Sequence, residues 1–308
     1  MPHSHHSHSG QFCRHAAQGS TLEDVVLEAI RKGFRTFGLS EHCPRYQQED
    51  LYPEESDLTP SDLYTTYLSF LTEAHRLKTL YASQINLLVG IESEYITDSD
   101  LSALERLLQE QGGRIQYVVG SVHHVDSIPV DFDVSTFETA LTHCKATRSS
   151  PDNYLKVYFD DQYKMLRRIQ PMVVGHFDLC RLFAPEIQLD ADMGIWEKVV
   201  RNIDHVIGYG GLFEVNAASF RKGWDQAYPG KEVLQHIIEK SGRLCLSDDS
   251  HGPKAVGLNY LRMKDYLVQN GIKEIWYLTD QESRDGKVVA KRYEGDWTTD
   301  EFWDKVRL

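Results

Sequence analysis

The sequence predicts an α/β protein built around a mostly parallel sheet. Short apolar runs typical of strands recur along the chain, and a segment with the apolar spacing of a helix separates each run from the next. Histidine or carboxylate residues follow directly after most of these runs. The expected strands cover residues 34–40, 85–91, 115–122, 171–177, 211–216 and 242–247.

Helices are expected between these strands. The first, residues 20–33, begins with the Ser20-x-x-Glu23 pattern of a capping box and ends at Gly33. Near the carboxyl end, two strands joined through Asp285-Gly286 predict a hairpin. Further amphipathic helices are expected at residues 61–82, 99–111, 192–207, 231–240 and 254–269.

The composition is that of a globular protein. With 308 residues, 41% of them apolar, the chain can enclose a sizeable core, and the lack of repeats and linkers favours a single domain over residues 1–308. The net charge of −13 opposes binding to nucleic acid or to an anionic membrane, since both require a basic surface. We therefore expect a small-molecule partner.

The cysteines and the hydropathy pattern indicate a cytoplasmic protein. The five cysteines are odd in number and form no C-x-x-C pair, which fits free thiols in a reducing compartment. No apolar stretch approaches the roughly 18 residues of a membrane span. No hydrophobic signal region follows the first residues.

Candidate metal ligands gather at the carboxyl ends of the expected strands. In a barrel these ends share one rim, where the active sites of such folds are built. A single histidine after a strand is usually a structural residue, but its repetition after strand upon strand favours a shared site. The residues concerned are His42, Glu92, His123, His176, Asp249 and His251.

The chemistry of these ligands indicates a catalytic metal cluster. Imidazole and carboxylate groups without thiolate are the ligands expected for zinc, manganese or iron, rather than for a structural zinc site. Because so many ligands exceed the needs of one tetrahedral ion, we expect a cluster of two or three divalent ions. Such clusters hydrolyse substrates by holding a substrate oxygen and converting a shared water to hydroxide.

The N-terminal segment HSHHSHSGQFCRH, residues 3–15, contains a further group of histidines. In isolation, such a run is more often an affinity tag or a flexible tail than part of a site. Both His3-Ser4-His5 and His6-Ser7-His8 form an H-x-H motif, and His15 follows soon after. The pattern is also that of one half of a metal site whose other half lies far away in the sequence.

In their order along the chain, these motifs resemble those of the polymerase and histidinol phosphatase (PHP) superfamily of metal-dependent phosphoesterases. The series H-x-H, a third His, a strand-end His, G-x-E, S-V-H, G-H and D-x-H runs through nearly the whole chain. The resemblance implies a distorted (β/α)7 TIM-like barrel with a trinuclear site in which Glu92 bridges two ions. It assigns ligand roles to His6, His8, His15, His42, Glu92, His123, His176, Asp249 and His251.

The same resemblance favours one of the two H-x-H motifs. The family usually places Ser or Thr directly after the second histidine, and Ser9 satisfies this rule whereas His6 does not. His6 and His8 are therefore expected to be the first ligands, with His3 and His5 as the alternative.

Three segments resemble the histidinol-phosphatase branch most closely: VGHFDL (174–179), EVNAASFRKGWDQAYPG (214–230) and SDDSHGPKAVG (247–257). The N-x-x-x-x-R-K pattern followed by YP places Arg221 after a strand, where its guanidinium can bind two phosphate oxygens. Lys222 and Arg181 are further candidates for offsetting phosphoryl charge. Glu92 and Asp249 are the candidate catalytic residues, and the carboxylates expected to orient ligand imidazoles are Glu41, Glu94, Asp178 and Asp248.

The resemblance implies a histidinol-phosphatase that hydrolyses L-histidinol phosphate in histidine biosynthesis, using two or three zinc, manganese or iron ions. One alternative is a PHP phosphoesterase acting on another phosphomonoester or on a nucleotide, against which the acidic charge and the FRKG segment count. The other alternative is a metal-binding protein without catalytic activity. The spread of candidate ligands over many loops counts against it, because a metal buffer does not need a barrel rim.

Overall fold

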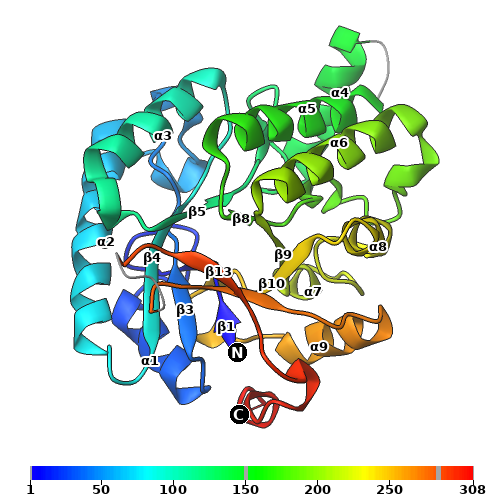
Figure 1. Ribbon diagram of the computed structural model, residues 1–308. Helices are drawn as coiled ribbons and strands as arrows, with labels where there is room; N and C mark the ends of the chain where they lie inside the picture. The colour runs from blue at the N-terminus through cyan, green and yellow to red at the C-terminus, as the bar shows by residue number, and fades with distance from the viewer. Residues whose placement is uncertain (1, 149–151, 282–285, 308) are drawn as a thin grey trace.

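The computed structural model describes residues 2–148, 152–281 and 286–307. Parallel strands form a nearly closed barrel (Figure 1), which confirms the predicted α/β class. Each expected strand is present, and the N-terminal segment supplies one more. In barrel order the strands are β1 (His3–Ser4), β3 (Thr36–Leu39), β4 (Asn86–Glu92), β5 (Tyr117–Gly120), β8 (Val173–Val174), β9 (Leu212–Asn216) and β10 (Arg243–Ser247).

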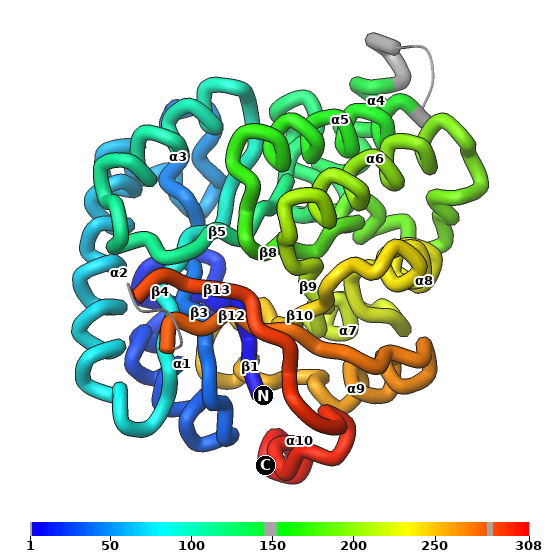
Figure 2. Tube along the Cα trace, in the orientation of Figure 1, coloured from blue at the N-terminus to red at the C-terminus, as the bar shows by residue number. Residues whose placement is uncertain are grey.

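Helices surround the barrel on its outside (Figure 2). Their apolar faces pack against the outer faces of the strands and enclose the main core. The long helices are α1 (Leu22–Arg31), α2 (Pro60–Leu80), α3 (Asp98–Gln111), α4 (Val134–Arg148), α5 (Asp152–Ile169), α6 (Met193–Tyr209), α8 (Lys231–Glu239) and α9 (Tyr260–Gln269). Two single-turn helices are α7 (Ala218–Arg221) and α10 (Phe302–Lys305).

Helix α1 begins one residue later than the sequence predicted. Thr21, not Ser20, is the N-cap: its side chain accepts from the backbone N–H of Asp24, and the Asp24 carboxylate accepts from Thr21 in return. The Ser20 hydroxyl instead donates to the carbonyl of Ala17 at 2.6 Å. The predicted capping box at Ser20 and Glu23 was therefore wrong, because a local turn occupies the Ser20 hydroxyl.

Two further differences concern helices. Helices α4 and α5 were not predicted, although they cover one side of the barrel. Helix α9 was expected from residue 254 but begins at Tyr260. Gly257 and Asn259 adopt the left-handed conformation, with φ of 66° and 64°, and this backbone cannot continue a right-handed helix.

The amino-terminal half of the barrel interior is filled with apolar side chains. Leu88, Tyr117, Val173 and Leu212 point inward from four strands and pack together. Leu278 joins this layer from β12 (Trp276–Thr279), which pairs antiparallel with β13 (Val289–Arg292) and passes across the barrel end beside the N-terminus (Figure 1). The pairing confirms the predicted hairpin, while Asp285 of its expected turn lies outside the described residues.

A seam joins the first and last barrel strands. The backbone N–H of Leu246 on β10 donates to Nε2 of His3 on β1 at 2.8 Å. Beyond the seam, two short strands pair in parallel, β2 (Ser7–His8) with β11 (Ser250–His251). A small hairpin, β6 (His124–Val125) with β7 (Ile128–Pro129), follows β5. Among the helices of the described residues, none is both long and apolar enough to cross a membrane.

Candidate metal centre

Strand alternation places the candidate ligands on the inner face of the barrel. On β4, Leu88 lies in the apolar interior layer, and Glu92 lies four residues further on, facing the same way. On β9, Leu212 and Glu214 repeat the pattern two residues apart. Since the strands are parallel, the polar residues gather at one end of the barrel while the apolar layer fills the other.

The carboxylate of Glu92 lies at the centre of the histidine cluster. It is 1% exposed and is surrounded by imidazoles from separate parts of the chain. Its Oε1 lies 3.0 Å from Nε2 of His6, 3.1 Å from Nε2 of His176 and 3.3 Å from Nε2 of His123. Its Oε2 lies 2.9 Å from Nδ1 of His42 and 3.4 Å from Nε2 of His8. Each carboxylate oxygen of Glu92 thus lies beside a different set of histidines, and each could bind an ion together with its own set.

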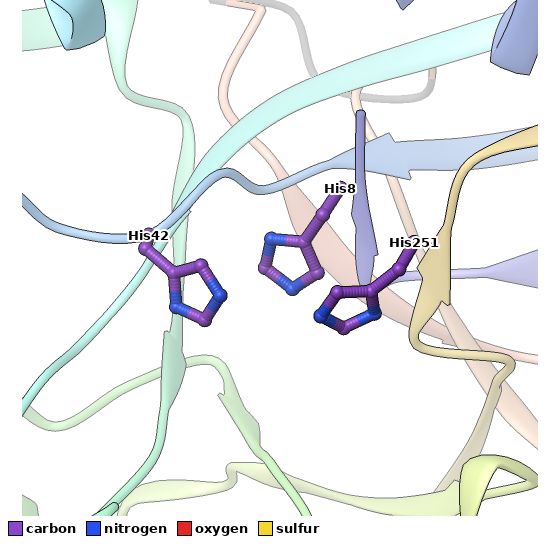
Figure 3. Close-up of side chains that lie close together, drawn as sticks. All are labelled: His8, His42 and His251. Carbon is purple, nitrogen blue, oxygen red and sulfur yellow. The ribbon is translucent and has the colours of Figure 1, made fainter. Parts of the chain in front are cut away.

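A second group of histidines lies toward the open side of the cluster. His8, His42 and His251 converge on one point (Figure 3), with ring centroids 4.2 Å apart for His8 and His42 and 4.5 Å for His8 and His251. The register of β2 with β11 sets His8 directly opposite His251. Nε2 of His15 lies 3.1 Å from Nε2 of His42, and Oδ1 of Asp249 lies 3.6 Å from Nε2 of His8.

The donor set fits divalent metal ions. Nε2 of His6 and Nε2 of His8 are buried and have no hydrogen-bond partner within the described residues, an arrangement that is costly unless another atom binds them. Nitrogen and carboxylate ligands in such number suit zinc, manganese or iron. Ligand atoms within 4.8 Å of one another form overlapping groups, among them His6-His8-Glu92, Glu92-His123-His176 and His8-His42-His251.

The electrostatic surroundings differ from one histidine of the cluster to another. Burial alone would raise the pKa of Glu92, but the nearby imidazoles, that of His6 foremost, hold this pKa well below its usual range. Burial opposes protonation of His6 and His123, yet the surrounding carboxylates raise the pKa of both well above the usual value. Burial and neighbouring imidazoles instead lower the pKa of His8 and His251 well below the usual value, which favours the neutral imidazole that binds metal.

Three buried carboxylates contact the Nδ1 atoms of three candidate ligand histidines. Oε2 of Glu214 lies 2.9 Å from Nδ1 of His6, and Oε2 of Glu94 lies 3.1 Å from Nδ1 of His123. Oε2 of Glu41 lies 3.4 Å from Nδ1 of His8. Such contacts fix the ring orientation and tautomer of a metal-binding histidine. Glu214 was not predicted, although a carboxylate in the middle of an apolar strand is a signal that could have identified it.

Asp248 and Asp178 were expected to orient imidazoles, but the structure gives them other contacts. Asp248 accepts from the Ser4 hydroxyl at 2.9 Å and from the Gly257 N–H at 2.6 Å, so it fixes the backbone around the β10 end. Oδ2 of Asp178 accepts from the Gly230 N–H at 2.9 Å and from the Arg181 guanidinium. Both carboxylates position loops of the rim.

Arg181 does not lie at the candidate site. The expectation that it contacts the substrate is not supported, because its side chain is 2% exposed and all of its strong contacts are internal. Its guanidinium donates to Asp178 at 2.6 Å, to Glu232 at 2.5 Å and to the Ile187 carbonyl at 2.6 Å. These partners use the guanidinium N–H groups that a phosphate would need, so Arg181 is a structural residue.

The two alternative histidines also have structural contacts. Nε2 of His3 accepts from the Leu246 N–H, and Nε2 of His5 accepts from the Leu278 N–H at 2.9 Å. Both side chains are fully buried: His3 lies at the seam with β10, and His5 contacts strand β12 of the hairpin. The structure therefore places His6 and His8, rather than His3 and His5, in the cluster.

One cysteine lies closer to the cluster than the sequence indicated. Sγ of Cys13 lies 3.2 Å from Nε2 of His15 and groups with His15 and His42. Burial raises the pKa of the Cys13 thiol, which favours its protonated form. The sequence predicted a ligand set of imidazole and carboxylate without thiolate, and Cys13 lies beside that set.

A cavity of about 320 Å³ opens beside the histidine cluster. Arg221 and Lys222 line it at the end of α7, and both side chains are exposed, as a substrate contact requires. The remaining lining residues that come from outside the strands were not predicted, because no periodic pattern marks them. These are Tyr52, Glu54, Asp131, Phe132, Leu179 and Tyr228.

A parallel barrel with imidazoles and carboxylates clustered on its carboxyl-end rim defines the class of metal-dependent barrel hydrolases. Residues 4–218 match the PHP domain family, and the chain belongs to this family. Two yeast proteins are similar along their whole lengths. The "Probable histidinol-phosphatase" of Schizosaccharomyces pombe is 45% identical over 99% of this chain and 97% of that protein. The "Histidinol-phosphatase" of Saccharomyces cerevisiae is 33% identical over 99% of this chain and 100% of that protein.

A solved structure shares the fold. The histidinol phosphate phosphatase of Lactococcus lactis, complexed with zinc, L-histidinol and phosphate, superimposes with a TM-score of 0.61 at 16% identity. The similarity covers 94% of this chain and 98% of that one. The similarity confirms the barrel fold across nearly the whole chain.

Proposed function

We propose that this chain is a histidinol-phosphatase, which hydrolyses L-histidinol phosphate to L-histidinol and phosphate. The observation that carries the proposal is a single cavity lined both by a cluster of candidate metal ligands and by the Arg221 side chain. This combination suits a phosphomonoester. The names of the two yeast relatives, at 45% and 33% identity over the whole chain, point to the same substrate.

The proposed ligands are the histidines and carboxylates of the cluster. When bound, two or three zinc, manganese or iron ions supply positive charge for the phosphoryl oxygens and lower the pKa of a water nucleophile. Glu92 is the carboxylate proposed to be shared between ions. The proposed ligand set is His6, His8, His15, His42, Glu92, His123, His176, Asp249 and His251.

The chain's own residues position the substrate and its charges. Arg221 donates through its planar fork to two phosphoryl oxygens, and Lys222 adds a point charge beside it. Asp249 is suited to ligation rather than to proton donation. Burial raises its pKa, but the imidazoles around it hold the pKa well below its usual range and keep the carboxylate charged.

The setting of this activity is part of the proposal. We place the enzyme in the cytoplasm and in histidine biosynthesis, and we treat residues 1–308 as one catalytic domain. None of the five cysteines forms a disulfide and all five are buried, as in proteins of a reducing compartment. The net charge of −13 supports a small phosphorylated substrate over nucleic acid.

Phosphate release from L-histidinol phosphate, measured beside a panel of nucleoside monophosphates, tests this function. We expect kcat/KM for L-histidinol phosphate to exceed that for each nucleotide by about 100-fold or more, because contacts with the alcohol part distinguish the esters. Bound metal is measured in the same samples. Equal rates across the panel would indicate a broad phosphoesterase, and metal binding without any turnover would indicate a non-catalytic protein.

Arg221→Ala tests the phosphate contact separately from the metals. We expect the metal content to stay unchanged while kcat/KM for L-histidinol phosphate falls about 10- to 150-fold, the value of a charge-assisted contact of roughly 1.5–3 kcal/mol. Arg221→Lys should recover part of the loss, since a point charge cannot form the two-pronged contact. Lys240→Ala, which removes a surface cation paired with Asp204, is the control. Wild-type kcat/KM in Arg221→Ala would remove this residue from the site.

A further inference from the structure

Two loops that the metal centre does not use form one wall of the cavity. The acidic, proline-containing segment at residues 47–62 carries Tyr52 and Glu54 to the cavity, and the loop after β7 carries Asp131 and Phe132. We call these residues the acidic-aromatic wall: Tyr52, Glu54, Asp131 and Phe132.

The aromatic part of the wall is held in place by stacking and by a buried ion pair. The rings of Tyr52 and Phe132 stack at 5.7 Å with an interplanar angle of 17°. The Arg45 guanidinium lies 4.9 Å from the centre of the Tyr52 ring and pairs with buried Glu55. A ring fixed in this way needs no rearrangement to receive a ligand.

The acidic part of the wall is open to the cavity. The Asp131 carboxylate forms no hydrogen bond or ion pair with another residue that the structure describes, and Asp131 is partly exposed. The Glu54 side chain is 27% exposed, and its Oε1 lies 3.8 Å from Nδ1 of His15. Burial lowers the pKa of His15 to about 2, so this imidazole is neutral and leaves the Glu54 charge uncompensated. Phe132 is 41% exposed although it is a large apolar residue. Two carboxylates beside the exposed Phe132 ring, which stacks on the buried Tyr52 ring, form the surroundings that organic cations prefer.

The opposite charges of the cavity come from different loops. Arg221 and Lys222 follow β9, whereas Glu54 follows β3 and Asp131 follows β5, so the two cations and the two carboxylates of the wall come from different parts of the rim. A substrate with a phosphate at one end and a cation at the other matches this distribution of charge. L-histidinol phosphate is such a molecule, because its amino group is protonated at neutral pH.

We propose that the acidic-aromatic wall binds the cationic amino-alcohol part of the substrate and selects for it, with Asp131 as a specificity-determining contact. The proposal rests on the proposed function and extends it from the phosphate to the leaving group. It predicts that the wall contributes to recognition of the alcohol and contributes nothing to binding of phosphate alone.

Asp131→Asn tests the wall, because it removes the charge and keeps the shape. We expect kcat/KM for L-histidinol phosphate to fall about 10-fold, the loss of one charged contact, with 4-nitrophenyl phosphate turned over as in the wild type. The inhibition constant of L-histidinol should rise by a similar factor, while that of inorganic phosphate stays unchanged. Phe132→Ala, at an exposed position, should act in the same direction.

Asp133→Asn is the matched control. Asp133 lies two residues away in the same loop, caps the start of α4 through the Thr136 N–H at 2.7 Å and does not line the cavity. Asparagine can also cap, so neither substrate should be affected. An equal loss on both substrates in Asp131→Asn would overturn the proposal, and so would the absence of any loss.

Wild-type behaviour separates this inference from the proposed function. If the wild type hydrolyses 4-nitrophenyl phosphate but not L-histidinol phosphate, the proposed function fails. The wall is then tested with phosphoethanolamine, which is also cationic. A preference for it that Asp131→Asn removes would support the wall, and no such preference would overturn it. Failure to hydrolyse any phosphomonoester would overturn both.

Discussion

Replacing Arg181 by methionine should destabilise the protein without disabling the active site. Methionine has a similar length but cannot pair with the carboxylates that surround the guanidinium. The change leaves Asp178, which is fully buried, and Glu232, which is 14% exposed in its side chain, without their shared cation. The Ile187 carbonyl also loses a donor.

The expected loss follows from this burial. Removing one partner of a buried ion pair costs about 3–5 kcal/mol, since the remaining charge stays in a medium of low polarity. For a chain of this length, 1 kcal/mol corresponds to roughly 2 °C in Tm, so Tm should fall by about 6–10 °C. Arg168→Met provides the comparison, because Arg168 pairs with Glu105 at the surface and should cost less than about 1 kcal/mol.

Thermal unfolding followed by circular dichroism measures the Tm, and kcat/KM is measured well below the lowered Tm. We expect Arg181→Met to retain kcat/KM for L-histidinol phosphate within a few-fold of the wild type, in contrast to Arg221→Ala. A large loss of kcat/KM with an unchanged Tm would refute the reasoning. It would show that Arg181 acts on the substrate and that its buried ion pairs contribute little to stability.

Three further predictions concern the metal centre and the N-terminus. Glu92→Gln should lose at least one ion per chain by metal analysis, because a neutral amide cannot balance two cations; full occupancy with full activity would reject the shared role. Glu214→Gln should weaken metal affinity about 10- to 100-fold in a chelator titration, since it loosens His6 without removing a ligand, and unchanged affinity would contradict this. Burial lowers the pKa of His5 to about 3, from 6.5 in the unfolded chain, so stability is lost as the pH falls below 6.5. In chelator-treated protein, this residue should contribute about 3 kcal/mol of the loss between pH 7 and 4.5. His5→Asn, which keeps an acceptor for the Leu278 N–H, should flatten the pH dependence measured by denaturant unfolding, and an equal slope in both proteins would exclude His5.

The barrel could be predicted because its strands are short, apolar and separated by helices. The elements that escaped prediction did so for identifiable reasons. Among the side chains described in helix α4, only Phe137, Ala140 and Cys144 are buried. So few apolar positions do not produce a recognisable helical pattern in the sequence. Helix α5 buries Tyr154, Leu155, Tyr158 and Phe159, and this spacing could have identified it.

The candidate ligands at the strand ends were predictable because alternation and strand ends restrict where a side chain can lie, whereas His6, His8 and His15 were assigned by the family resemblance. Arg181 shows the limit of this reasoning. Its neighbour Asp178 is close in sequence, but Glu232 is 51 residues away, so the sequence does not reveal that the guanidinium is already neutralised. The acidic-aromatic wall depends in the same way on two loops whose packing no local pattern encodes.

The register of β2 with β11 also determines when the metal centre can assemble. His8 and His251 belong to the first and the last parts of the barrel, so most of the chain must be synthesised before both can bind the same ion. An ion held by both closes a loop of nearly the whole chain, and it therefore acts as a cross-link that restricts the unfolded state. If His8 and His251 hold the same ion, as proposed, metal is acquired late in folding. Loss of the ions should open the barrel first at the seam between β1 and β10.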